Sequence, residues 1–131
     1  MLDHLICDCD GVLVDSEVIA DHVMLDTLTS TFPGIDFEVA VKSAFGQQTS
    51  RFLENLQASQ NITLPADFLQ TVEHNVERAL ASSLCAISGV RDALQRVTLP
   101  AAVVSNSRMS RVLASVKRAG LTEIFAGRIF S

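Results

Sequence analysis

The spacing of hydrophobic and polar positions changes twice along the chain. Residues 5–7 and 12–14 are short continuous apolar runs on either side of an acidic turn. Residues 16–84 carry apolar side chains at helical spacing, and residues 89–130 alternate between helical and continuous apolar patterns. The run at 5–7 predicts a buried strand that opens into a turn. The pattern therefore predicts a strand, then a helical region, then a mixed region.

The helical region from Ser16 to Leu84 predicts four helices in a small antiparallel bundle. Turn-forming residues separate them at Phe32-Pro33-Gly34, at Gly46 and at Leu64-Pro65. The last helix has an apolar face that recurs every four residues: Phe68, Val72, Val76, Leu80 and Leu84. We expect Pro65 in the first turn of that helix, and Ser16 and Asp36 as N-caps of two others.

The region after Gly89 predicts alternating helices and strands. Residues 89–97 and 108–119 have helical spacing, and Gly120 ends the second helix. Residues 101–104 are a short apolar strand, and residues 128–130 begin another. Strands that alternate with helices are typical of a parallel α/β sheet.

The chain therefore predicts an α/β core, residues 1–15 and 88–131, interrupted after its first strand by a helical insertion, residues 16–87. The insertion takes about 70 of the 131 residues and leaves about 60 for the core. A core of that size is marginal, because it buries too little surface. We expect the chain to be part of a longer protein or to need a partner segment that completes the core.

Composition places the chain among globular proteins. It is 48% hydrophobic and 19% charged, and its mean hydropathy is +0.31, which excludes a disordered chain. No apolar run approaches the roughly 18 residues of a membrane span, and the start lacks the features of a signal peptide. We predict a cytoplasmic protein that does not bind membranes.

Charge argues against nucleic-acid binding. The net charge is −5, whereas affinity for phosphate backbones comes from clustered Lys and Arg. Residues 87–131 carry seven bases and two acids, and we interpret these bases as solvated helix faces. The three cysteines, Cys7, Cys9 and Cys85, are too few and unpaired for a disulfide framework. We interpret Cys7 and Cys9 as small apolar residues and not as a zinc site.

The acidic turn after the first strand is the strongest candidate for chemistry. Ligands bind beyond the carboxyl ends of strands in open parallel sheets, and Asp8 and Asp10 lie at such an end. Gly11 permits a tight turn that brings both carboxylates toward one pocket. Two close carboxylates repel and need a cation, and oxygen ligands of this kind suit Mg²⁺. An aspartate in this place can also be a nucleophile that forms an aspartyl-phosphate.

This part of the chain resembles the first motif of the haloacid dehalogenase superfamily. The matching run is Leu5-Ile6-Cys7 followed by Asp8-Cys9-Asp10-Gly11-Val12-Leu13-Val14-Asp15-Ser16. The resemblance implies that Asp8 is the nucleophile and a Mg²⁺ ligand. It implies that Asp10 protonates the leaving oxygen, later activates water, and binds Mg²⁺ through its backbone carbonyl. An acid at position 10 favours phosphoryl transfer over carbon–halogen cleavage.

Ser105 ends the strand at 101–104 and resembles the second motif of the same superfamily. The resemblance implies that its hydroxyl and the backbone N–H of Asn106 bind a phosphoryl oxygen. Such contacts suit phosphoryl transfer, which depends mainly on positioning and charge stabilisation. From the residues alone, Ser105 or Ser107 is equally an N-cap of the next helix.

The helical insertion resembles the four-helix cap of the β-phosphoglucomutase and phosphoglycolate phosphatase branch. The implied fold is an incomplete Rossmann-like parallel sheet with an inserted cap that closes over the site and selects the substrate. That branch has a substrate-contacting loop where this chain has residues 46–51. We expect Gln47, Gln48 and Arg51 to contact the leaving group. The alternative is a plain helix C-cap followed by a solvent-facing helix start.

Two departures from the branch refine the prediction. The mutases have a Thr and then a His where this chain has Ser16 and Ala20, which favours a hydrolase. The superfamily's third-motif Lys and fourth-motif acidic pair follow Ser131 in the family order. Lys42 and Lys117 are not at the place of that Lys, and we interpret both as solvated.

These residues predict a Mg²⁺-dependent phosphatase that hydrolyses a small phosphorylated metabolite, such as a sugar phosphate, through an aspartyl-phosphate. Three alternatives remain: a phosphomutase, a phosphoacceptor module of the response-regulator receiver type, and a truncated, non-catalytic binding or interaction protein. Receiver modules carry adjacent acids after the first strand and their acceptor Asp after the third, unlike this chain.

Overall fold

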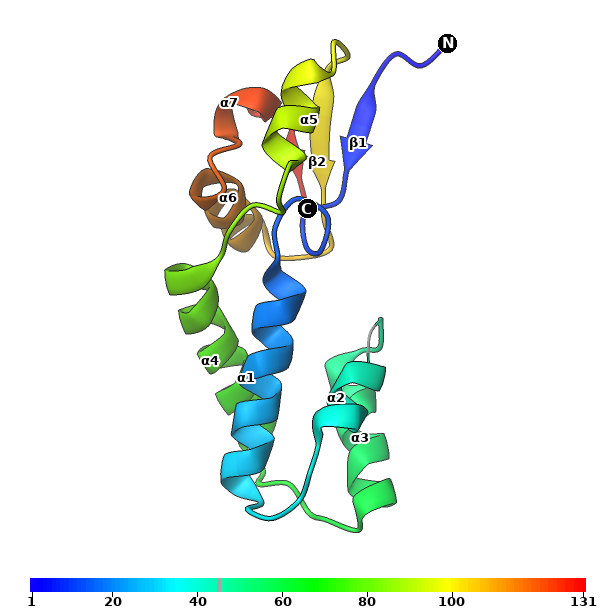
Figure 1. The fold of residues 1–131 in the computed structure, drawn as a ribbon, viewed down its shortest axis with the longest axis vertical. Coiled ribbons are helices and arrows are strands. Elements are labelled where there is room, and N and C mark those ends of the chain that lie inside the picture. Colours follow the sequence, from blue (N-terminus) through cyan, green and yellow to red (C-terminus); the bar gives the residue numbers. More distant parts are fainter. Residues whose placement is uncertain (45) are drawn as a thin grey trace. The chain divides into compact units, whose positions relative to one another are not determined.

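A computed structural model describes residues 1–44 and 46–131 (Figure 1). The chain divides into two compact units: Met1–Ile19 with Leu80–Ser131, and Ala20–Ala79. No helix in the described part of the chain is long and apolar enough to span a bilayer.

Among residues 1–44 and 46–131, the first unit contains a parallel sheet of three short strands. They are β1 (Leu5–Cys7), β2 (Ala101–Val104) and β3 (Ile129–Phe130), in the order β1-β2-β3. Cys7 lies opposite Val103, and Val103 lies opposite Ile129. The predicted α/β fold with a parallel sheet is therefore confirmed.

Three helices accompany the sheet within the described residues of the first unit: α5 (Val90–Arg96), α6 (Met109–Arg118) and α7 (Thr122–Phe125). The first two agree with the predicted helices to within about two residues. The pattern missed α7, because four residues are too few to show a helical period. It begins after Gly120, where φ is +71°, and it buries Phe125 completely.

The two faces of the sheet differ in exposure. Connections between neighbouring parallel strands are right-handed, so the order β1-β2-β3 places the connecting helices on one face. Side chains alternate along a strand, and those facing the helices are buried, including Val103 (0% exposed). On the opposite face Ile6, Val104 and Phe130 are 69%, 46% and 55% exposed. Within residues 1–44 and 46–131, the buried side chains of the first unit therefore lie on one side of the sheet.

The insertion forms four helices in the described residues: α1 (Ser16–Thr31), α2 (Glu38–Ser43), α3 (Thr49–Gln60) and α4 (Phe68–Ser83). Their number and the breaks between them agree with the prediction. The predicted apolar face is buried at every position: Phe68, Val72, Val76, Leu80 and Leu84. Helices α1 and α4 each continue from one unit into the other.

The starts of three helices in the insertion differ in detail from the prediction. Pro65 lies before α4, where its carbonyl accepts the Phe68 N–H at 3.0 Å, so its placement in the first turn was wrong. Ser16 is the first residue of α1 and not its N-cap, because its hydroxyl is donated to Asp10. The Asp36 carboxylate does accept the Glu38 N–H at 2.9 Å, although Phe37 occupies the N-cap position of α2.

Five of the seven bases in residues 87–131 are exposed, as expected, but Arg111 and Arg128 are half-buried and correct that interpretation. Arg128 Nε donates to the Ala101 carbonyl at 2.8 Å, and Arg118 Nε donates to the Leu84 carbonyl at 3.1 Å. Arg118 Nη2 also donates to the Ser82 carbonyl. A guanidinium has several donors in a fixed plane, so it can bind backbone carbonyls while part of it stays in water. Lys42 and Lys117 are exposed, as expected.

The unequal faces of the sheet predict unequal effects of two phenylalanine truncations. Phe125→Ala removes a fully buried ring and should lower the free energy of unfolding by roughly 3–5 kcal/mol. Phe130→Ala removes a ring that is 55% exposed and should cost less than about 1 kcal/mol. Urea unfolding of both variants and the unchanged protein measures the difference. Equal destabilisation by the two changes would contradict the one-sided core.

Candidate active site

The acidic turn after β1 is a closed loop of backbone hydrogen bonds. The Cys9 carbonyl accepts the N–H groups of Val12, Leu13 and Val14 at 3.4, 2.9 and 3.2 Å. The Gly11 N–H donates to the Val14 carbonyl at 2.9 Å. Gly11 has φ +72°, and a β-carbon there would lie 2.9 Å from Cδ of Glu17. The positive φ therefore favours glycine at this reversal of the chain, whereas the Glu17 carboxylate is the end of a flexible side chain that could move.

Asp8 lies directly after β1 with an exposed side chain. Its Oδ1 accepts the backbone N–H of Cys9 at 2.7 Å, which fixes the carboxylate at the carboxyl end of the strand. An exposed carboxylate at this edge of the sheet can reach a ligand from solvent. The position suits the nucleophile that the sequence predicts.

Asp10 is enclosed by three side chains from two segments, the start of α1 and the residues that follow β2. Its Oδ1 accepts the Ser16 hydroxyl at 2.7 Å, and its Oδ2 accepts the Ser107 hydroxyl at 2.6 Å. Arg111 Nη2 lies 3.6 Å from Oδ1, and the Asp10 side chain is 25% exposed. Both oxygens are thus occupied, and the side chain has one defined orientation.

Ser105 ends β2 beside the acidic turn. It is buried, its N–H donates to the Phe130 carbonyl at 3.1 Å, and its hydroxyl oxygen accepts the Ser107 N–H at 3.1 Å. Asn106 is the next residue and is exposed. Since strands β1 and β2 pair in parallel, their carboxyl ends meet at one edge. The segment 105–107 therefore lies against Asp10, through Ser107.

The sequence reasoning missed the roles of Ser107 and Arg111. The sequence predicts Ser105 or Ser107 as the N-cap of the next helix, but Arg108 occupies that position of α6 without a capping side chain. The charge pattern predicts that Arg111 is solvated, like the other bases of its segment. A signal was present for Arg111: α6 buries Val112, Ser115 and Val116, and position 111 borders that stripe one turn before Ser115.

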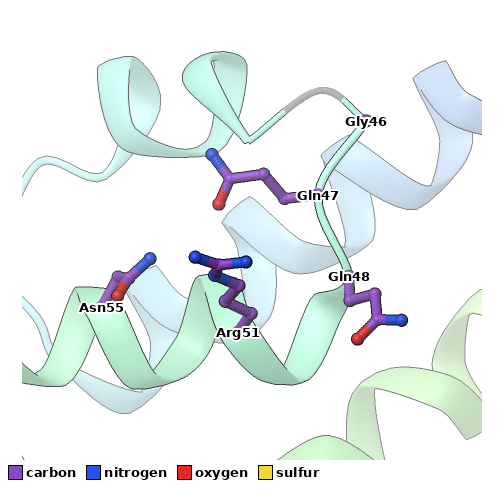
Figure 2. Close-up of a pocket in the computed structure, with 5 residues that line it drawn as sticks. All are labelled: Gly46, Gln47, Gln48, Arg51 and Asn55. Carbon is purple, nitrogen blue, oxygen red and sulfur yellow. The ribbon is translucent and has the colours of Figure 1, made fainter.

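The helical unit has a polar hollow of about 550 Å³ lined by Gly46, Gln47, Gln48, Arg51 and Asn55. Figure 2 shows the Arg51 guanidinium between the side chains of Gln47 and Asn55, while the Gln48 amide points away. Gln47 Nε2 lies 3.5 Å from the Ser43 carbonyl, to which it donates. A guanidinium between two amides can bind an anionic or hydroxylated group.

Asn55 was not among the predicted residues of this hollow. It lies one helical turn after Arg51 on α3, so the two side chains share a face. That spacing was the available signal. The structure thus brings Gln47 and Arg51 together, adds Asn55, and leaves Gln48 at the rim.

The donors at the acidic turn fit a small hard cation. Among residues 1–44 and 46–131, no group of three or more His, Cys, Asp or Glu side chains is placed to hold a metal ion. Mg²⁺ commonly takes only one or two carboxylates and completes its shell with water and phosphate oxygens. The exposed Asp8 carboxylate and the Asp10 backbone carbonyl are oxygen donors of this kind.

Cys9 lies between the two aspartates and is 1% exposed. Burial, followed by the negative charges of Asp10 and Asp8, raises the pKa of its thiol to about 11, and the charge of Arg111 opposes this shift. A thiolate is the nucleophilic and metal-binding form, and it is scarce at such a pKa. Cys9 therefore acts as packing inside the turn, as the sequence indicated.

Comparison with known proteins gives one family and several relatives. The model of the haloacid dehalogenase-like hydrolase family matches residues 5–130. The 6-phosphogluconate phosphatase of Escherichia coli (strain K12) is 29% identical over 125 residues, which are 95% of this chain and 57% of that protein.

Two solved structures share both fold and sequence with the chain. A conserved haloacid dehalogenase-like protein of unknown function from Agrobacterium tumefaciens is 34% identical, with a TM-score of 0.91 over 100% of this chain and 59% of that one. A HAD family hydrolase from Deinococcus radiodurans, with bound phosphate and sodium, is 30% identical, with a TM-score of 0.81 over 99% and 58%. The chain thus spans less than two thirds of the length of these relatives.

The environment of Cys9 predicts slow alkylation. At pH 8 a thiol of pKa about 11 is ionised in only about one molecule in a thousand, so iodoacetamide should modify Cys9 very slowly. Cys85 is exposed and should react first. Mass spectrometry of peptides at several reaction times measures both rates, with urea-unfolded protein as the control in which the rates converge. Equal rates in the folded protein would contradict the buried position.

Proposed function

Because the chain belongs to the haloacid dehalogenase-like hydrolase family, we propose that the full protein is a phosphatase acting on small phosphorylated, sugar-like metabolites. One observation carries the proposal: an exposed Asp8 and a held Asp10 lie at the carboxyl end of β1, against the segment that follows β2. This edge of a parallel sheet is where ligands bind.

The proposed reaction has two steps. A carboxylate oxygen of Asp8 attacks phosphorus, the bond from phosphorus to the substrate oxygen breaks, and Asp10 gives its proton to that leaving oxygen. Asp10 then takes a proton from water, which attacks the aspartyl-phosphate. Inorganic phosphate leaves and Asp8 is regenerated. The exposure of Asp8 and the enclosed position of Asp10 suit these unequal roles.

Ser105 and Asn106 are proposed to bind the phosphoryl group. The Ser105 oxygen accepts the Ser107 N–H, so its own hydroxyl proton is directed elsewhere and can be donated to a phosphoryl oxygen. The Asn106 N–H follows at the end of β2. Donors fixed before the reaction stabilise the developing charge without reorganisation.

Mg²⁺ is the proposed cofactor, held by the Asp8 carboxylate and the Asp10 backbone carbonyl. Water and phosphate oxygens would complete its coordination. When bound, it neutralises negative charge on the phosphoryl group and on Asp8. The chain's own contribution is to hold the two aspartates and the phosphoryl-binding segment at one edge. The donor set contains only oxygen, which suits this ion.

Residues 16–87 are proposed to be a cap that selects the substrate, with residues 1–15 and 88–131 as part of the core. In the cap, Gln47, Gln48 and Arg51 are the proposed contacts to the leaving group, joined by Asn55. A hollow with one guanidinium and several amides suits a polyhydroxylated, anionic leaving group. The name of the Escherichia coli relative makes 6-phosphogluconate a suitable first probe.

The nucleophile is tested by Asp8→Asn in the full-length protein. We expect release of inorganic phosphate from 6-phosphogluconate to fall at least a thousandfold, roughly the scale of losing a covalent nucleophile. The change keeps size and hydrogen bonding while it removes the attacking oxygen. Asp3→Asn, at an exposed position before β1, is the matched control and should retain activity. Chelation with EDTA should stop the reaction, and added Mg²⁺ should restore it.

Two results would overturn this assignment. One is activity that survives Asp8→Asn. The other is turnover of sugar phosphates into isomers with almost no phosphate released, which would identify a phosphomutase.

The hollow in the helical unit is tested by Arg51→Met. Loss of the guanidinium should raise KM for 6-phosphogluconate about tenfold or more, since a charged hydrogen bond contributes roughly 1.5–3 kcal/mol. KM for p-nitrophenyl phosphate should change little, because its leaving group has neither carboxylate nor hydroxyls. Glu54→Gln, exposed on the same helix α3, is the control. An equal rise of KM for both substrates would show that Arg51 does not contact the leaving group.

A further inference from the structure

The Asp10 carboxylate is bound from the segment that follows β2 by two side chains with no assigned function. Ser107 donates its hydroxyl to Oδ2 at 2.6 Å, and Arg111 brings Nη2 to 3.6 Å from Oδ1. Ser107 lies in the loop before α6, and Arg111 lies in the first turn of that helix. The two contacts approach different oxygens, so together they restrict rotation of the carboxylate.

Ser107 is itself held in place. Its N–H donates to the hydroxyl oxygen of Ser105 at 3.1 Å, and Ser105 is anchored to β3 through its own N–H. A chain of hydrogen bonds thus runs from the sheet through Ser105 and Ser107 to Asp10. The Ser107 hydroxyl is therefore positioned by the same strand end that is proposed to bind the phosphoryl group.

The Arg111 side chain is partly buried, although a charged side chain is ordinarily more stable in water. Its side chain is 33% exposed, and its Nε is buried without a hydrogen-bond partner among the described residues. A buried donor without a partner costs free energy. The guanidinium keeps this position at 3.6 Å from Asp10, where its charge attracts the carboxylate. The free energy lost at the unpaired Nε is therefore accompanied by a favourable attraction between the guanidinium and the Asp10 carboxylate.

We propose that Ser107 and Arg111 are positioning residues that orient the Asp10 carboxylate toward the leaving group. The proposal rests on the proposed function, in which Asp10 protonates the leaving oxygen. Neither residue is required to touch the substrate. Together with the Ser16 hydroxyl on Oδ1, they keep Asp10 in one rotamer, since proton transfer needs the acid within hydrogen-bond reach of the oxygen it protonates.

The basicity of the leaving group separates this role from a structural one. An alkyl phosphate expels a strongly basic alkoxide and needs a well-placed acid. p-Nitrophenyl phosphate expels a weakly basic phenolate that leaves without protonation. A variant in which only Asp10 is misplaced should therefore release the alkyl leaving group slowly and p-nitrophenol at nearly the normal rate. A variant in which Asp8, the phosphoryl-binding segment or the fold is damaged should be slow with both.

The experiment uses Ser107→Ala and Arg111→Met in the full-length protein. The rate of leaving-group release in a single turnover is measured with 6-phosphogluconate and with p-nitrophenyl phosphate. We expect a decrease of about tenfold or more for the first, part of the roughly 10²–10⁴-fold that acid–base catalysis supplies, and less than about threefold for the second. KM should stay nearly constant for both. Arg111→Lys should recover part of the rate, and Lys117→Met, which removes an exposed charge from the same helix, should match the unchanged protein.

A crystal structure of the Ser107→Ala, Arg111→Met double variant tests the positioning without activity. We expect the Asp10 side chain to leave its present rotamer or to become disordered while β1 and β2 stay in place. Equal losses with both substrates, or an unmoved Asp10 in the double variant, would refute the proposal. If the unchanged protein hydrolyses neither substrate, the proposed function fails, and the rotamer of Asp10 in the double variant still decides whether these residues position it.

Discussion

The hydrogen bond from Ser107 to Asp10 joins two segments that lie 97 residues apart in the sequence. It exists because β1 and β2 pair in parallel, which brings the turn after each strand to the same edge of the sheet. The turn after β1 supplies the carboxylates, and the turn after β2 supplies hydroxyls, N–H groups and, one helical turn later, a guanidinium. Neither turn is a site by itself. The pairing of two strands of three and four residues therefore sets the geometry of the candidate site.

A helical insertion between these strands is tolerated because its two ends are tied together within the first unit. Val14 pairs with Ala86 in an antiparallel bridge, and the Ile87 N–H donates to the Leu13 carbonyl at 3.0 Å. The Asp15 carboxylate accepts the Cys85 N–H at 3.0 Å, and the Asp15 N–H donates to the Cys85 carbonyl. The chain thus leaves and returns to the sheet at nearly one point. These contacts close the insertion at its base, next to the acidic turn.

Elements whose signal is periodic or local could be predicted from the sequence. The four-residue spacing of Phe68, Val72 and their successors gave α4 its buried face, and the acidic turn with Gly11 gave the first half of the site. The roles of Ser16, Ser107 and Arg111 could not be read in this way. Each depends on a partner that is distant in sequence or on the other side of a turn. A serine that caps a helix and a serine that binds a distant carboxylate cannot be told apart in the sequence, because both place a hydroxyl at the start of a helix.

The excess of basic residues after position 87 shows that a count of charges, too, does not reveal the partners of each residue. Net charge and its sign describe what a surface attracts, but they do not say which bases reach that surface. Arg118 and Arg128 bind backbone carbonyls, and Arg111 lies against Asp10. Lysine has a single nitrogen and could not replace the planar fork at such places without losing donors. Three of the seven bases in this segment therefore have defined partners within the first unit, which a count of charges alone could not reveal.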